Sequence, residues 1–229
     1  MQNQNIKLAV DAIVFGYEKG ELYCVLVKQK FGDYKNIWSI PGGFVLENES
    51  LSDAVKRELK EETSLEVDYL EQLYTFGDDV KRDSRFRVIS VAYFSLVNSE
   101  SLHLIADTDA LDAQWFKINE LPELAFDHAK ILQVAFDRLK QKVQYQPIGF
   151  NLLKKEFPFS DLENVYKAIV GHDIDRRNFR KKILSFEILD ETDKFSDKKG
   201  GRPAKLFKFN AKKYRALEKS GFHFEIKLN

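Results

Sequence analysis

An α+β chain of two domains is predicted by three features of the sequence. Strand-like and helix-like segments alternate without a regular repeat over residues 1–146. Beyond them the order becomes helix, turn, helix and two-stranded ribbon. Charge is divided in the same way: residues 149–229 hold 19 Lys+Arg and 12 Asp+Glu, whereas residues 1–148 hold 17 and 24. We therefore predict a mixed α/β domain in residues 1–146 and a basic winged helix-turn-helix domain in residues 147–229.

The front domain is expected to begin with a β-hairpin. The β-rich runs Leu8–Tyr17 and Leu22–Lys28 flank the turn-like segment Glu18–Glu21. The Pro-Gly-Gly tract within Trp38–Val45 predicts a loop. The remaining expected elements are a helix at Ser50–Thr63 with Ser50 and Asp53 as its capping residues, strands at Arg87–Val97 and Ala113–Ile118, and a helix at Ala129–Val143.

The rear domain follows a boundary near Gln144–Gly149 that Pro147 and Gly149 mark. A helix is predicted at Phe159–Val170, with Ser160 and Glu163 as a capping pair. After the break at Gly171, the rest of the domain is expected to comprise a helix at Asp175–Phe186 and two β-like pieces at Ile188–Thr192 and Lys205–Asn210 around the polar segment Asp193–Ala204. This order is typical of a winged helix-turn-helix.

Composition narrows the functional class. The single cysteine, Cys24, excludes an intrachain disulfide framework and a zinc site with several cysteines. The polar start of the chain has no apolar signal segment, and no apolar run approaches the ~20 residues that span a bilayer. A cytoplasmic protein without a membrane partner is therefore expected, and the basic rear domain favours a polyanion partner.

A cluster of carboxylates is the most specific signal in the front domain. Glu58, Glu61 and Glu62 fall within about 100° of arc on one face of the predicted helix. Crowded carboxylates repel one another unless a cation lies between them, and Mg²⁺ prefers carboxylate oxygens together with substrate phosphates. Arg57 can hold one carboxylate in orientation, and the glycines at 42 and 43 allow a close backbone approach.

The spacing from Gly43 through Glu49 to the tract Arg57–Leu65 resembles the Nudix box. The resemblance implies an α/β/α sandwich and a metal site of Glu58, Glu61 and Glu62. It also implies that Arg57, Glu58 and Glu61 serve catalysis if the protein is an active hydrolase, and that Glu49 supports the loop. Ser64 departs from the pattern, because the family has a glycine there. Nudix domains can bind nucleotide diphosphates with or without hydrolysing them, so activity stays open.

The second predicted helix of the rear domain has one apolar side and one cationic side. Phe179, Ile183 and Phe186 lie within about 60° of one another, although Leu184 falls off this stripe. The expected DNA-binding side chains of this helix are Arg176, Arg177, Asn178, Arg180 and Lys181. Arginine and asparagine can read base edges, and the same cations can neutralise phosphates.

The polar segment between the two β-like pieces carries further cations. Lys198, Lys199 and Arg202 surround a Gly-Gly pair that permits a tight chain reversal, as at the tip of a wing. Taken alone, such a charge run is more often a solvated face. Joined to the cationic helix and the basic domain, it favours a contact with double-stranded DNA.

Four tracts sharpen the resemblance to the NrtR family of Nudix-related transcriptional regulators: Leu124–His128, Gln146–Phe150, Arg177–Lys181 and Gly201–Ala204. The resemblance implies a homodimeric bacterial regulator whose front domain senses a small effector, either an ADP-ribose-like nucleotide or a pentose sugar. The tract Asp83–Arg87 resembles an effector-facing tract of this family. Gly42, Gly43, Arg82 and Arg85 are therefore the expected effector-binding residues.

Two functions remain open from the sequence. The first is a DNA-binding regulator, repressor or activator, controlled by the effector. The second is a Mg²⁺-dependent Nudix hydrolase that cleaves ADP-ribose or a related nucleoside diphosphate derivative. The retained glutamates favour the second, and the cationic helix and wing favour the first. His128 is expected to be structural.

Overall fold

The computed structural model describes residues 5–98, 113–196 and 203–228, so the predicted wing-tip cations Lys198, Lys199 and Arg202 lie outside the described residues. The chain divides into two compact units. Unit 1 comprises Met1–Gly16 and Tyr23–Asp137, and unit 2 comprises Tyr17–Leu22 and Arg138–Asn229. Among the described helices, none is both long and apolar enough to span a bilayer.

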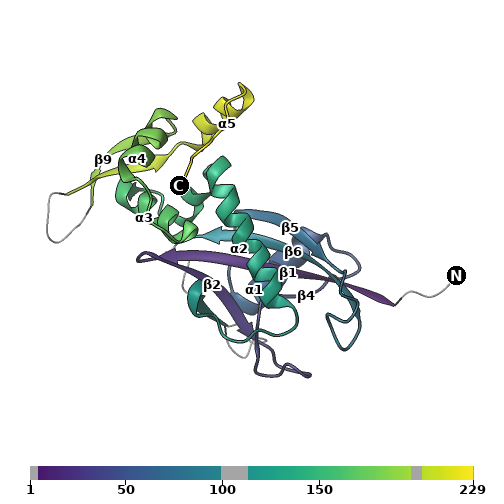
Figure 1. The fold of residues 1–229 in the computed structure, drawn as a ribbon. Helices are drawn as coiled ribbons and strands as arrows, with labels where there is room; N and C mark the ends of the chain where they lie inside the picture. Colours follow the sequence, from purple (N-terminus) through teal and green to yellow (C-terminus); the bar gives the residue numbers. More distant parts are fainter. Residues whose placement is uncertain (1–4, 99–112, 197–202, 229) are drawn as a thin grey trace. The chain divides into compact units, whose positions relative to one another are not determined.

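A mixed sheet forms the centre of unit 1 (Figure 1). Its strand order is β3-β2-β1-β6-β5, with β4 paired to β1 and β7 paired to β2. The long strands β1 and β6 run parallel, whereas β4 pairs with β1, β3 and β7 pair with β2, and β5 pairs with β6 in antiparallel fashion. The strands are β1 (Ile6–Glu18), β2 (Glu21–Lys28), β3 (Trp38–Ser39), β4 (Gly42–Phe44), β5 (Leu70–Phe76), β6 (Arg87–Val97) and β7 (Ala113–Lys117).

Alternate residues of β1 face opposite sides of the sheet, as the period of a strand requires. Val10, Ala12 and Val14 pack in one buried cluster with Val55 and Leu59 of helix α1 (Leu51–Thr63). On the opposite face, the ring of Phe15 lies 6.4 Å from that of Phe136, in helix α2 (His128–Tyr145). Helices therefore cover both faces of the sheet, which confirms the expected α/β/α sandwich.

Helix α1 begins and ends at residues that the sequence singled out. The hydroxyl of Ser50 accepts a hydrogen bond from the amide of Asp53, which confirms the predicted N-cap. Ser64 closes the helix with φ 56° and ψ 16°, in the left-handed region, and its amide donates to the carbonyl of Lys60. Left-handed backbone costs an L-residue with a Cβ more than it costs glycine.

Replacing Ser64 with glycine is therefore expected to stabilise the protein. The relief of left-handed strain exceeds the entropy that glycine adds to the unfolded chain, and the free energy of unfolding should rise by about 1 kcal/mol. Urea unfolding of the wild type and of Ser64→Gly measures this difference, and Ser64→Ala is the matched control because it keeps the strain. A Gly variant that is no more stable than the Ala variant would contradict the assignment.

Unit 2 contains several helices (Figure 1). Its small sheet has the strand order β8-β10-β9. Buried aromatic side chains fill the core of this unit. The ring of Phe179 lies 4.9 Å from that of Tyr166, and the ring of Phe207 lies 5.9 Å from that of Phe159. The elements are a 3₁₀ segment at Pro147–Leu152, β8 (Phe157–Pro158), α3 (Phe159–Val170), α4 (Arg176–Ser185), β9 (Leu189–Phe195), β10 (Lys205–Phe209) and α5 (Ala211–Lys219).

The described flanks of the wing converge as expected. The amide of Ser196 donates to the carbonyl of Ala204 at 2.8 Å, and the amide of Ala204 donates to the hydroxyl of Ser196 at 3.1 Å. The order of α3, α4, β9 and β10 confirms the predicted winged helix-turn-helix.

Two local predictions are wrong. Ser160 does not cap α3: the N-cap is Pro158, which has no side-chain cap, and Glu163 instead accepts hydrogen bonds from Arg176. The segment Trp38–Val45, predicted as a loop, contains the short strands β3 and β4. Strand pairing with β1 and β2 holds these glycine-rich residues extended, an influence from distant sequence that local turn signals do not carry.

Candidate functional site

Arg57 of α1 lies at the centre of a cluster of carboxylates. Its Nε and Nη2 donate to the two oxygens of Glu49, at 3.0 Å and 2.7 Å, and these hydrogen bonds lower the pKa of Glu49 to about 2. Its Nη1 donates to Glu58 at 2.7 Å and to Glu61 at 3.2 Å. Glu49 also accepts from the amide of Leu46, so it ties the loop to the helix. One guanidinium thus orients three carboxylates.

Glu58 and Glu62 lie beneath the glycine strand β4. The amide of Gly42 donates to Glu62 at 2.9 Å. Burial and then the nearby carboxylate of Glu58 raise the pKa of Glu62 to about 8, and burial raises the pKa of Glu58. A Cβ on Gly43 would lie 2.3 Å from a carboxylate oxygen of Glu58, and one on Gly42 would lie 2.2 Å from the carbonyl oxygen of Val10. Because the carbonyl of Val10 is backbone, position 42 requires glycine, whereas a side chain at position 43 would displace the carboxylate of Glu58.

Burial is the main cause of both raised pKa values, so the carboxyl groups of this cluster lie where water solvates a negative charge poorly. Its oxygen donors are those that a hard divalent cation prefers. In the described part of the chain, however, no group of three acidic, histidine or cysteine side chains converges closely enough to hold a metal ion. One reason is that the side chain of Glu61 is 51% exposed and contacts Arg57.

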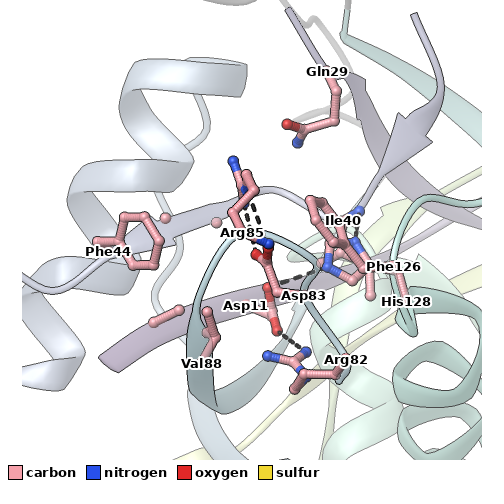
Figure 2. A pocket seen from close by; sticks show the side chains of 13 residues that line it. Asp11, Gln29, Ile40, Phe44, Arg82, Asp83, Arg85, Val88, Phe126 and His128 are labelled. Carbon is pink, nitrogen blue, oxygen red and sulfur yellow. Dashed lines mark hydrogen bonds and ion pairs between the residues drawn. The ribbon is translucent and has the colours of Figure 1, made fainter. Parts of the chain in front are cut away.

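A cavity of about 170 Å³ opens on the other side of the glycine strand (Figure 2). The four residues expected from the sequence to bind an effector, Gly42, Gly43, Arg82 and Arg85, all line it. The other lining residues are Ala9, Asp11, Gln29, Ile40, Phe44, Asp83, Val88, Phe126 and His128. The structure thus brings together residues from β1, β4, β6 and the segment before α2.

Arg82 lies at the base of this cavity in a buried ion network. Its Nε and Nη2 donate to the two oxygens of Asp127 at 3.0 Å and 2.6 Å, and its Nη2 lies 3.6 Å from Asp11. The hydroxyl of Ser90 donates to the same Asp11 carboxylate. Two carboxylates therefore already neutralise Arg82, whose side chain is only 5% exposed. These contacts are those of a side chain that holds the wall of the cavity in position.

His128 completes the network at the start of α2. The amide of Ile40 donates to its Nδ1 at 2.9 Å, and its Nε2 lies 3.6 Å from Asp11 (Figure 2). Because Nδ1 accepts a hydrogen bond, the proton of the neutral ring is on Nε2. Burial lowers the pKa of His128, so the ring is neutral at pH 7.

Stability is expected to fall in mild acid because of His128. The unfolded chain protonates this ring near pH ~6.5, whereas the folded state, with its lowered pKa, resists protonation. The unfolded state then binds more protons, so the contribution is present above pH ~6.5 and is lost as the pH falls towards the folded pKa. Denaturant unfolding between pH 7 and pH 5 measures the slope. The His128→Gln variant should lose less stability over this range, and equal losses would contradict the assignment.

The accessible cation of the cavity is Arg85. Its guanidinium forms a two-point contact with Asp83, at 3.0 Å and 2.7 Å, yet its side chain remains 44% exposed. It also lies 5.3 Å from the ring centre of Phe126, which contacts Tyr34 at 4.4 Å. Phe126 has φ 54°, in the left-handed region. This backbone conformation is strained for a residue other than glycine, and it sets the direction of the aromatic ring. This side of the cavity thus combines a cation with two aromatic rings that contact each other at an interplanar angle of 50°.

Helix α4 presents the cationic face that its sequence predicts. Asp175 caps it by accepting from the amide of Asn178 at 3.0 Å. Phe179 and Ile183 are buried, and Arg177 and Lys181 are exposed. Within the described residues, neither of these two cations forms an ion pair with a carboxylate. Both are therefore available to a polyanion.

The other predicted DNA-binding residues of α4 already contact the protein. Arg176 contacts the buried carboxylate of Glu163, with its Nε at 3.0 Å and its Nη2 at 2.9 Å. Arg180 lies over the ring of Phe159 at 4.4 Å, and the side-chain amide of Asn178 donates to Asp175 at 2.8 Å. These contacts fix α4 on its unit while leaving Arg176 and Arg180 partly exposed.

Several residues that line the cavity or contact its lining were not expected from the sequence. Asp11 interrupts an apolar strand, and a single acid in such a run is the signal that could have found it. Asp127 and Phe126 lie in a tract that indicated the family. That tract did not predict which residues these two side chains contact. Tyr34 had no recognisable signal.

Comparisons with known proteins agree with both units. The model of the NUDIX domain family matches residues 6–135, and that of the NrtR DNA-binding winged helix domain matches residues 149–209. The chain is 32% identical, over 211 residues, to the "ADPR responsive transcriptional repressor NtrR" of Acinetobacter baylyi, a match that covers 90% of this chain and 83% of the repressor.

Two further relatives match one or both units. Over 129 residues the chain is 40% identical to the ADP-ribose pyrophosphatase of Methanocaldococcus jannaschii, covering 55% of this chain and 70% of the enzyme. The crystal structure of Shewanella oneidensis NrtR complexed with a 27mer DNA matches with a TM-score of 0.81 at 29% identity. This match covers 96% of this chain and 99% of that one.

A Nudix sandwich with a cavity lined by charged and aromatic side chains, followed by a winged helix, defines a class of DNA-binding proteins that respond to a small molecule. The chain belongs to the Nudix family and, within it, to the NrtR-type transcriptional regulators. The predicted fold class and family are thereby confirmed.

Proposed function

We propose that this regulator binds operator DNA through α4 and the wing, and that ADP-ribose in the cavity of unit 1 controls that binding. The observation that carries the proposal is the exposure of Arg177 and Lys181 on α4, where neither forms an ion pair with a carboxylate of the described residues. The predicted contacts at Arg176, Asn178 and Arg180 flank this pair, and the wing cations would add phosphate contacts.

The choice of ADP-ribose rests on the chemistry of the cavity and on the relatives. Arg85 is an accessible fork donor for a diphosphate, and Phe126 offers an aromatic face to a base. Gly42 and Gly43 let backbone approach a ligand. The relatives named above are an ADPR responsive repressor and an ADP-ribose pyrophosphatase. A pentose, the alternative effector, carries no negative charge for the exposed guanidinium of Arg85 to bind.

Hydrolysis is the second candidate activity, favoured by the intact set of Arg57, Glu58, Glu61 and Glu62. The carboxyl groups of Glu58 and Glu62 supply oxygen donors of the kind that a divalent cation prefers, and Mg²⁺ would be held by the three glutamates. When bound, the ion would polarise the diphosphate and help generate hydroxide. Arg57 would orient Glu58 and Glu61, and Gly42 would orient Glu62 through its amide.

Release of AMP and ribose 5-phosphate from ADP-ribose, with and without Mg²⁺, tests this second candidate. Turnover that requires Mg²⁺ and disappears in Glu61→Gln would support an active hydrolase. No turnover in the wild type would reduce unit 1 to a sensor.

The proposal also covers the oligomeric state of the protein, its cellular compartment and the boundary between its domains. A homodimer would present two copies of α4 to a palindromic operator in the cytoplasm. The functional boundary between sensor and DNA-binding domains is proposed at residues 146 and 147, just before Pro147. Linkage requires ADP-ribose to favour one arrangement of the two DNA-binding domains.

A thermal-shift screen of ADP-ribose, NAD, arabinose and xylose tests the effector. Selective binding to the folded state raises the melting temperature, so ADP-ribose should raise it most. Arg85→Gln should reduce the ADP-ribose shift. A larger shift with arabinose or xylose would overturn the nucleotide assignment.

A further inference from the structure

Helix α5 carries three cations on one face. Lys212, Arg215 and Lys219 follow one another at spacings of three and four residues, which places them within about 60° of arc. All three side chains belong to exposed residues, and within the described part of the chain none forms an ion pair with a carboxylate. We call these three residues the α5 stripe.

The opposite face of α5 fixes the helix on unit 2. The ring of Tyr214 lies 6.0 Å from that of Phe209 and 6.4 Å from that of Phe224. Lys213 lies beside the stripe and contacts Glu187 at 3.4 Å. The hydrophobic anchor and this ion pair leave the stripe facing solvent.

The start of α5 is also held close to the end of α4. The side chain of Asn210 caps α5 by accepting from the amide of Lys213 at 2.8 Å, and the amide of Asn210 donates to the carbonyl of Ile188 at 2.9 Å. Ile188 and Glu187 follow α4 almost directly in the chain. The stripe is therefore rigidly attached beside the C-terminal end of the helix that we propose to read DNA.

We propose that the α5 stripe is a further DNA contact, which grips the phosphate backbone flanking the bases that α4 faces. The inference rests on the proposed function of α4. Lys212 and Lys219 are about 10 Å apart along the helix axis, a distance over which one DNA strand presents about three phosphates. Three cations in a row match successive phosphates, and contacts to phosphates carry no direct sequence information.

The position of α5 favours DNA over other polyanions. The stripe belongs to the same compact unit as the winged helix domain, but it lies beyond residues 149–209, which the model of that domain matches. It therefore extends the DNA-binding surface that α4 and the wing are proposed to form. A cationic face that is merely solvated is the outcome that the following experiment must exclude.

The test compares the wild-type chain with the triple variant Lys212→Gln, Arg215→Gln, Lys219→Gln. Binding to DNA from upstream of its own gene, and to a duplex of unrelated sequence, is measured at salt concentrations from about 50 to 200 mM. The slope of log affinity against log salt should become shallower by about two to three, since each lost phosphate contact removes about one. Both duplexes should lose affinity by the same factor, between about tenfold and hundredfold at 0.1 M salt.

The charge-conserving variant Lys212→Arg, Arg215→Lys, Lys219→Arg is the control and should keep the wild-type slope. Equal melting temperatures of all three proteins would show that α5 remains folded. An unchanged slope in the Gln variant, with tight binding by the wild type, would overturn the α5 contact alone. A wild type without affinity for either duplex would overturn the proposed function as well.

Discussion

Reversing the charges of Arg177 and Lys181 together is expected to weaken binding to operator DNA by about hundredfold at 0.1 M salt. Both side chains are exposed, and neither forms an ion pair with a carboxylate of the described chain, so nothing internal depends on their charge. Each glutamate removes a phosphate contact and adds repulsion. Fluorescence anisotropy with DNA from upstream of the protein's own gene measures the loss.

The matched control reverses two exposed lysines of unit 1, Lys7 and Lys56, and makes the same change in net charge. This control should bind DNA as the wild type does, apart from a weak general effect of charge. Similar losses in the two double variants would mean that total charge, and not the face of α4, governs binding. Undiminished affinity of the Arg177 and Lys181 variant would remove α4 as the DNA-reading helix.

Replacing Arg82 with methionine is expected to lower the free energy of unfolding by about 3 kcal/mol or more. The guanidinium lies between Asp127 and Asp11 in a buried network, so its loss leaves two carboxylates without their cation. Asp11 suffers more because its side chain is only 8% exposed. Urea unfolding at pH 7 measures the change, and the cavity should also bind ADP-ribose more weakly because its base is distorted.

A double-mutant cycle separates the ion pair from the loss of side-chain packing. Asp127→Asn should cost less in the Arg82→Met background than in the wild type, with a coupling of about 1 kcal/mol or more. The control is the substitution Lys56→Met, because Lys56 is exposed and belongs to the same unit. Lys30 also lies outside the network, but it has interactions of its own and is not a suitable control. Additive effects, or a loss below about 1 kcal/mol for Arg82→Met, would contradict the network.

Periodicity and motif spacing predicted most of the fold, because strong local signals and the final packing agree. Helix α1 begins at Ser50 and ends at Ser64 as its capping signals indicate, and α4 buries Phe179 and Ile183 while exposing Arg177. The short strands β3 and β4 and the strand β5 were missed. Their extended backbone depends on pairing with strands distant in the sequence, and no residue pattern within them shows such a partner.

The candidate site was predictable where one helix or loop contains it. The three glutamates and Arg57 share α1, so their proximity follows from helix geometry. Asp11, Arg82 and Asp127 come from segments far apart in the chain, and only the folded sheet shows that they meet. The pairing of Arg176 with Glu163 is similar, since it joins two helices whose contact the sequence does not specify.

The affinity of the full-length protein for its operator, measured with and without saturating ADP-ribose, tests the central claim most directly. If the cavity of unit 1 controls the DNA-binding face of α4, the two dissociation constants should differ by about fivefold or more, as is typical of allosteric coupling. The Arg85→Gln variant should need more ADP-ribose for the same change. Identical dissociation constants, under conditions where ADP-ribose demonstrably occupies the cavity, would contradict the account.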